Sequence, residues 1–76
     1  MIQGFIQALR VQSKIIFIVV RNHAGLMQVV VTADNSEFEK AKNLTLESVI
    51  RVEGELVDAP QAPGGKEIHP NKIEIL

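Results

Sequence analysis

Residues 15–31 read Ile-Ile-Phe-Ile-Val-Val-Arg-Asn-His-Ala-Gly-Leu-Met-Gln-Val-Val-Val, and this stretch decides the fold. β-branched residues dominate both of its halves, and the short polar segment 22–25 separates them. Gly25 can adopt the positive φ that a tight turn needs. The stretch is therefore predicted to form two β-strands joined by a hairpin turn.

Side chains alternate between the two faces of a strand, which sorts the first half of this hairpin into two sets. Phe17 and Arg21 share one face with Val19, while the opposite face holds Ile16, Ile18 and Val20. One of the two faces must belong to the core. The other then presents an aromatic ring and a cation, joined from the second strand by the amide of Gln28. That combination suits an unstacked base of a single-stranded nucleic acid better than plain solvent.

The segments before and after the hairpin have their own signatures. Residues 2–11 are predicted to form a first strand with Gly4 as a bulge or bend point, and residues 12–14 form a turn. After the hairpin, Ser36 and Glu39 match a capping-box pattern. Phe38, Ala41 and Leu44 follow at helical spacing, so a short helix is expected from about residue 37 to 43, with Phe38 closing the bottom of the core.

Alternation returns at residue 48 and predicts a half-buried fourth strand. Its inward set is expected to be Ile50, Val52, Gly54 and Leu56. The segment 58–65 contains two prolines and two glycines and is predicted to be the loop that reverses the chain. Residues 67–76 are predicted as the fifth strand, with Pro70 indicating an edge or a bulge and with Ile73 and Ile75 pointing inward.

Three strands, a helix and two further strands is the order of an all-β, five-stranded OB-fold Greek-key barrel with one short helix between the third and fourth strands. The alternative is an SH3-like barrel, which usually lacks a helix of this length at this position. With 76 residues, the chain is expected to be one domain spanning residues 1–76. An OB-fold binds oligonucleotides across the face formed by its second and third strands.

Charge and composition narrow the function. The net charge is −1, with +3 in residues 1–31 and −4 in residues 32–76, so nucleic-acid binding should be local and directed at bases. There is no cysteine, and His23 and His69 stand far apart, so no metal site is predicted. Gly64 and Gly65 lack the flanking residues of a phosphate-binding loop, and no cofactor is expected. An apolar run of only six residues, 15–20, predicts no membrane span and favours a cytoplasmic protein.

Several phrases in the chain occur together, in the same order, in one known family. These are Gly4-Phe5-Ile6, Arg10, the pattern Phe17-x-x-x-Arg21-Asn22-x-x-Gly25-x-x-Gln28-Val29, Glu47-Ser48-Val49, Val52-Glu53-Gly54 and Ala62-Pro63-Gly64-Gly65-x-Glu67-Ile68. Along its whole length the chain resembles the N-terminal anticodon-binding domain of aspartyl- and asparaginyl-tRNA synthetases. It departs from that family at Phe5, where the family has tryptophan, and at Asn22, where it has aspartate.

The resemblance implies that the partner is the anticodon loop of a tRNA whose middle base is uridine. It implies that Phe17 stacks on that base and that Gln28 hydrogen-bonds to it, with Glu67 and Arg10 near the first anticodon base and the loop backbone. Arg21, on the same strand face as Phe17, is also expected to bind RNA. The catalytic domain of such enzymes is absent, so this chain alone is not expected to be an enzyme. Two alternatives are an isolated, engineered or reconstructed OB-fold scaffold and a general binder of short single strands.

Overall fold

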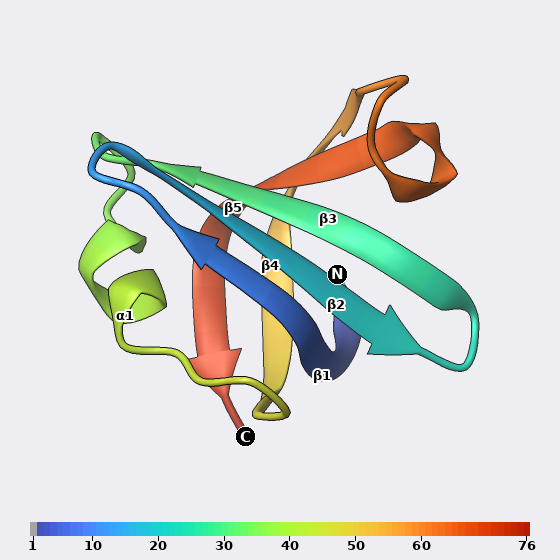
Figure 1. Cartoon of the computed structure of the whole chain (residues 1–76), viewed down its shortest axis with the longest axis horizontal. Helices are drawn as coiled ribbons and strands as arrows, with labels where there is room; N and C mark the ends of the chain where they lie inside the picture. The colour runs from blue at the N-terminus through green and yellow to red at the C-terminus, as the bar shows by residue number, and fades with distance from the viewer. Residues whose placement is uncertain (1) are drawn as a thin grey trace.

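Five strands close into a barrel in the spatial order β1-β2-β3-β5-β4 (Figure 1). The computed structural model describes residues 2–76, except for the side chain of Pro63. The strands are β1 (Ile2–Val11), β2 (Ile15–Asn22), β3 (Gly25–Thr32), β4 (Val49–Asp58) and β5 (Lys66–Ile75). The helix α1 (Phe38–Lys42) lies between β3 and β4, and a 3₁₀ turn, η1 (Pro63–Gly65), precedes β5. This is the predicted five-stranded OB-fold, with the helix at the predicted place in the order.

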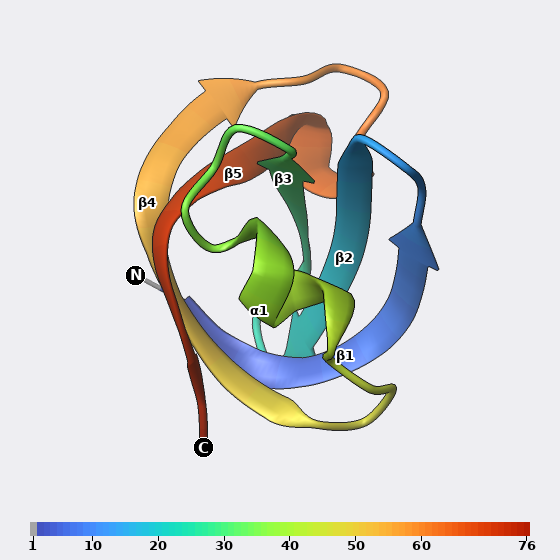
Figure 2. The ribbon, with the colours of Figure 1, turned by 90° about the vertical axis from the view of Figure 1, so that its left-hand side faces the viewer.

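The barrel closes because β1 pairs with two strands, β4 and β2. Its first residues, from Ile2 to Phe5, pair with β4, and from Phe5 onward it pairs with β2. Figure 2 shows the resulting curve of β1 around the barrel. Gly4 lies at this change of partner, where a Cβ atom would stand 2.3 Å from the carbonyl oxygen of Arg21. The bend expected at Gly4 is therefore present, but the register shift lies farther on, between Ile6 and Ala8.

The core fills the inside of this barrel, as the alternation in β2 predicts. Ile16, Ile18 and Val20 are at most 1% exposed, whereas Phe17 and Val19 on the other face are half-buried. The helix lies across one open end of the barrel (Figure 2). All three residues expected on its apolar side are buried, namely Phe38, Ala41 and Leu44. Phe38 thus closes the bottom of the core, as expected from its place in the sequence.

The predicted capping box is wrong. The helix begins at Phe38, its N-cap is Glu37, and no side chain caps it. The backbone N–H of Glu37 instead donates to Oδ1 of Asn35 at 2.8 Å. The carboxylate of Glu37 accepts a hydrogen bond of 2.6 Å from the backbone N–H of Ile73. The helix start is therefore organised by Asn35 and by the contact of Glu37 with β5, and the contact with β5 cannot be predicted from a local pattern.

A bulge separates the two halves of the β4–β5 hairpin. The register shifts between Glu53, which pairs with Lys72, and Gly54, which pairs with Pro70. Pro70 therefore marks a bulge, as predicted, and β5 is no edge strand because it pairs with both β3 and β4. The expectation that Leu56 and Ile75 point into the core is wrong, since they are 54% and 58% exposed. Both lie near ends of the hairpin, and a bulge increases the twist beyond it, so strict alternation does not carry through.

The loop after β4 is closed at its base by two contacts. The backbone N–H of Ala59 donates to the carbonyl of Gly65, and Nζ of Lys66 lies 2.6 Å from Oδ1 of Asp58. The hydrogen bond and positive charge of Lys66 lower the pKa of the Asp58 carboxyl. Because the carboxyl is exposed, solvent and salt screen the pair and its effect on stability is small.

Replacing Lys66 by glutamine is expected to raise the pKa of Asp58 toward its ordinary value, which an NMR pH titration of the Asp58 carboxyl measures. The sign follows from the lowered pKa in the folded state: the pair stabilises above the ordinary pKa, and its contribution is lost as the pH falls through the lowered one. An unchanged Asp58 midpoint in Lys66→Gln would contradict this assignment.

Candidate nucleic-acid interface

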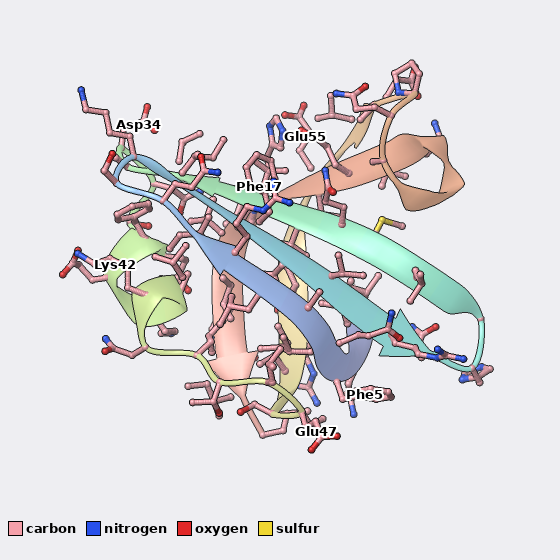
Figure 3. The ribbon with its side chains drawn as sticks, in the orientation of Figure 1. Phe5, Phe17, Asp34, Lys42, Glu47 and Glu55 are labelled. Atoms are coloured by element: carbon pink, nitrogen blue, oxygen red, sulfur yellow. The ribbon has the colours of Figure 1, made fainter. Side chains whose placement is uncertain are left out.

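The outer face of the β1–β2–β3 sheet carries the aromatic ring of Phe17. Phe17 is half-buried on this face, opposite Arg10 of β1 in the strand register. Because the inner positions of β2 already fill the core, the ring of Phe17 lies outside the barrel. It lies well away from Phe5, which is near the other end of the sheet (Figure 3).

Polar side chains on β3 and β5 continue this surface. Gln28 is the register partner of Val19 on one side and of Glu67 on the other, where β3 and β5 run parallel. Nε2 of Gln28 lies 3.5 Å from Oε1 of Glu67. The other carboxylate oxygen, Oε2, lies 2.6 Å from Nε2 of His69. The side chain of Glu67 is only 15% exposed. Its carboxylate is largely removed from water, and Gln28 and His69 provide it with polar partners.

A groove of about 560 Å³ runs along this face. The volume lies in the range of small-ligand sites, about 300–1,000 Å³. Its lining consists of Ala8, Leu9, Arg10, Phe17, Val19, Gln28, Gln61 and Glu67. Apolar side chains provide contact area, while an amide, a carboxylate and a guanidinium provide hydrogen bonding and charge. This mixture can stack an unpaired base and hydrogen-bond to its edge.

Four of the five RNA-binding residues expected from the sequence therefore line the same groove. The exception is Arg21, which lies about 13 Å along β2 from Phe17. Its Nη1 donates to Oε1 of Gln7 at 2.9 Å. It borders a separate hollow of about 750 Å³ together with Phe5 and Leu26. The structure thus separates Arg21 from the groove around Phe17.

Two further residues acquire roles from the structure. Gln61 lines the groove but comes from the proline- and glycine-rich loop, and no motif in the sequence singles it out. Asn22 organises the hairpin turn: its Oδ1 accepts from the backbone N–H of Ala24 at 2.9 Å, and its Nδ2 donates to the carbonyl of Gln3. Gly25 follows with φ of 127°, as the turn prediction requires.

Within residues 2–76, no group of three or more His, Cys, Asp or Glu side chains is placed to hold a metal ion. Over the same part of the chain, no helix has the length and apolar character needed to cross a membrane.

The chain is similar to several proteins of known sequence and structure. The family model described as an OB-fold nucleic acid binding domain, named for the tRNA anti-codon, matches residues 1–76. The aspartate–tRNA(Asp/Asn) ligase of Methanococcus vannielii is 38% identical over an alignment of 78 positions, which covers 99% of this chain and 18% of the ligase. The cytoplasmic asparagine–tRNA ligase of Saccharomyces cerevisiae is 35% identical, and the match covers 99% of this chain and 14% of that ligase.

A solved structure shows the same relation. The asparaginyl-tRNA synthetase from Pyrococcus horikoshii, complexed with asparaginyl-adenylate, superposes with a TM-score of 0.89 at 36% identity. The match covers 99% of this chain and 18% of the synthetase chain. The chain thus spans less than a fifth of the length of these relatives. It belongs to the family of OB-fold nucleic acid binding domains, and its whole length is related to one domain of the aspartate and asparagine tRNA ligases.

Proposed function

We propose that this chain is an anticodon-loop binding module of the aspartate and asparagine tRNA ligase type, and that it reads a middle-position uridine. The observation that carries the proposal is that Phe17 and Gln28 line one groove on the outer face of the barrel. A ring and an amide on neighbouring strands can act on one base at the same time, because neighbouring strands lie about 4.8 Å apart.

Each contact has a defined chemical role. The ring of Phe17 provides a stacking platform, which contributes roughly 1–3 kcal/mol per base. The amide of Gln28 carries both an acceptor and a donor, which match the N3–H and a carbonyl oxygen of uracil. Arg10, opposite Phe17 in the register, supplies a positive charge for the loop backbone. The proposal concerns RNA binding alone, and none of these residues is proposed to catalyse the ligation for which the relatives are named.

These contacts are few, so binding by the isolated chain is expected to be weak. One stacked base and one neutral hydrogen bond of about 0.5–1.5 kcal/mol cannot hold a tRNA tightly on their own. With a net charge of −1, the chain has no general attraction for phosphate. Affinity is therefore expected to be about micromolar at best and to weaken as the salt concentration rises.

Titration of an anticodon stem-loop tests the proposal. Phe17→Ala is expected to weaken binding about tenfold or more, because the stacking platform is lost. Gln28→Ala is expected to weaken it less, by the value of one hydrogen bond. Phe5→Ala is the matched control, since it removes an equal ring from the separate hollow.

Equal affinities of the wild type, Phe17→Ala and Gln28→Ala would contradict the proposed surface. Equal affinity of the wild type for an oligo-dT strand and for the stem-loop would indicate a general binder of single strands instead.

A further inference from the structure

We propose that Glu67 fixes the orientation of the Gln28 amide, and that His69 in turn holds Glu67. The groove then accepts a base that offers an N–H to the Gln28 carbonyl oxygen and rejects a base that offers a lone pair there. Glu67 and His69 are thus positioning residues that select uracil over cytosine. The inference rests on the proposed function, because it concerns how Gln28 reads the middle base.

The three side chains form a connected row across two strands. Gln28 of β3 and Glu67 of β5 are register partners, with 3.5 Å between Nε2 and Oε1. His69 lies two residues farther along β5, on the same face of that strand, and its Nε2 is 2.6 Å from Oε2 of Glu67. The side chain of Glu67 is 15% exposed and that of His69 is 46% exposed. The row therefore runs from the groove outward to the solvent.

The chemistry of a carboxylate decides which way the amide points. An ionised carboxylate only accepts hydrogen bonds, whereas an amide has a donor end and an acceptor end. With the donor end toward Glu67, the amide meets an acceptor. With the amide turned over, the carbonyl oxygen of Gln28 would face the carboxylate oxygen. The separation of 3.5 Å is long for a hydrogen bond, but the charge of Glu67 still attracts the NH₂ group and repels the carbonyl.

This orientation leaves Oε1 of Gln28 and its second N–H available to a base. Uracil offers an N3–H donor beside a carbonyl acceptor, so both contacts are satisfied. Cytosine offers a lone pair at N3 beside an amino group, so acceptor would meet acceptor and donor would meet donor. Cytosine could bind equally well only if the amide of Gln28 turned over, and Glu67 opposes that rotation.

His69 completes the arrangement. Each carboxylate oxygen of Glu67 has one partner, Gln28 on one side and His69 on the other. The short contact to His69 restrains the carboxylate from turning away from Gln28. Each oxygen can accept a second hydrogen bond, so this positioning role does not depend on whether Glu67 also contacts the first anticodon base.

The experiment compares two anticodon stem-loops that differ only in the middle base, uridine or cytidine. The wild type is expected to prefer uridine by about tenfold or more, as a matched pair of hydrogen bonds does. In Glu67→Gln, the new amide can either donate to or accept from Gln28, so the preference is expected to fall to about threefold or less. The two stem-loops share the same first anticodon base, so any loss of a contact between Glu67 and that base lowers both affinities equally and cancels in the ratio. The ratio is therefore the quantity that reports the orientation of the Gln28 amide.

Glu53→Gln is the matched control, because it removes one negative charge from an exposed position of β4 and should retain the wild-type ratio. His69→Ala is expected to lower the ratio, and His69→Gln is expected to restore it by again donating to Oε2. Circular dichroism melts establish that each variant is folded.

A folded Glu67→Gln protein with the wild-type ratio would overturn the inference. A wild type that binds both stem-loops equally would overturn the inference and also the reading of a middle uridine in the proposed function. A wild type that binds neither stem-loop would overturn the proposed function, and the inference with it. A lower ratio in Glu67→Gln, measured while the uridine stem-loop still binds detectably, supports both.

Discussion

Gly54→Val is expected to destabilise the barrel by about 3 kcal/mol or more, which is a large part of the stability of a small domain. A Cβ atom at this position would lie 2.3 Å from the carbonyl oxygen of His69 and 2.6 Å from Cα of Pro70. Both neighbours belong to backbone, so no side chain can move aside to make room. The strand β5 would have to shift, and with it the pair Glu67 and His69 at the groove.

Urea unfolding followed by circular dichroism measures this effect. Glu55→Val is the matched control: it introduces the same side chain next to Gly54, at an exposed position of β4 (Figure 3). Its stability is expected to stay within about 0.5 kcal/mol of the wild type. If Gly54→Val were as stable as Glu55→Val, the close approach of β4 and β5 at the bulge would be disproved.

Phe38→Ala is expected to cost about 3–5 kcal/mol, because it removes a buried aromatic side chain and leaves a cavity at the end of the barrel. Phe38, the first residue of α1, is 7% exposed and packs in the central core cluster. A domain of 76 residues has a total stability of about 4–11 kcal/mol, so this variant should be close to unfolding. Lys42, with Nζ 5.5 Å from the ring centroid, adds a weaker cation–π contact that is lost as well.

Thermal and urea unfolding measure the free energy of unfolding of Phe38→Ala and of Phe5→Ala. The comparison separates the effect of burial from the loss of an aromatic ring as such. Phe5 is 39% exposed, so its replacement should cost much less. Similar losses in the two variants would show that α1 does not close the core.

Local sequence patterns predict most of the fold, and the predictions that fail do so for physical reasons. Alternation sorts the residues of β2 into two faces because one strand face must be covered in a small barrel, and the structure buries the face of Ile16, Ile18 and Val20. The same rule fails at Leu56, where the bulge and the end of the hairpin remove the cover that alternation assumes. The helix is found at its predicted place, but its start depends on Asn35 and on the contact of Glu37 with β5.

The candidate site was predictable only in part. Gln28 stands out in the sequence because a polar amide in a run of valines must be exposed or paired. A phenylalanine in a strand is most often part of the core, so only the structure places the ring of Phe17 on the outer face. Resemblance to a family adds Arg10 and Glu67, but it does not show that Glu67 contacts Gln28. Arg21 shares the face of Phe17 by alternation, yet the length of β2 carries it into a different hollow. Gln61 has no signal in the sequence at all.

The sequence by itself determined the order of the strands along the chain, the short helix and the division of β2 into two faces, because periodicity and turn chemistry are properties of neighbouring residues. Tertiary structure alone decided that β3 pairs in parallel with β5 and sets Gln28 beside Glu67, 39 positions away. That pairing depends on closure of the whole barrel, in which many weak contacts act together across distant parts of the chain. The groove exists only once those contacts have formed.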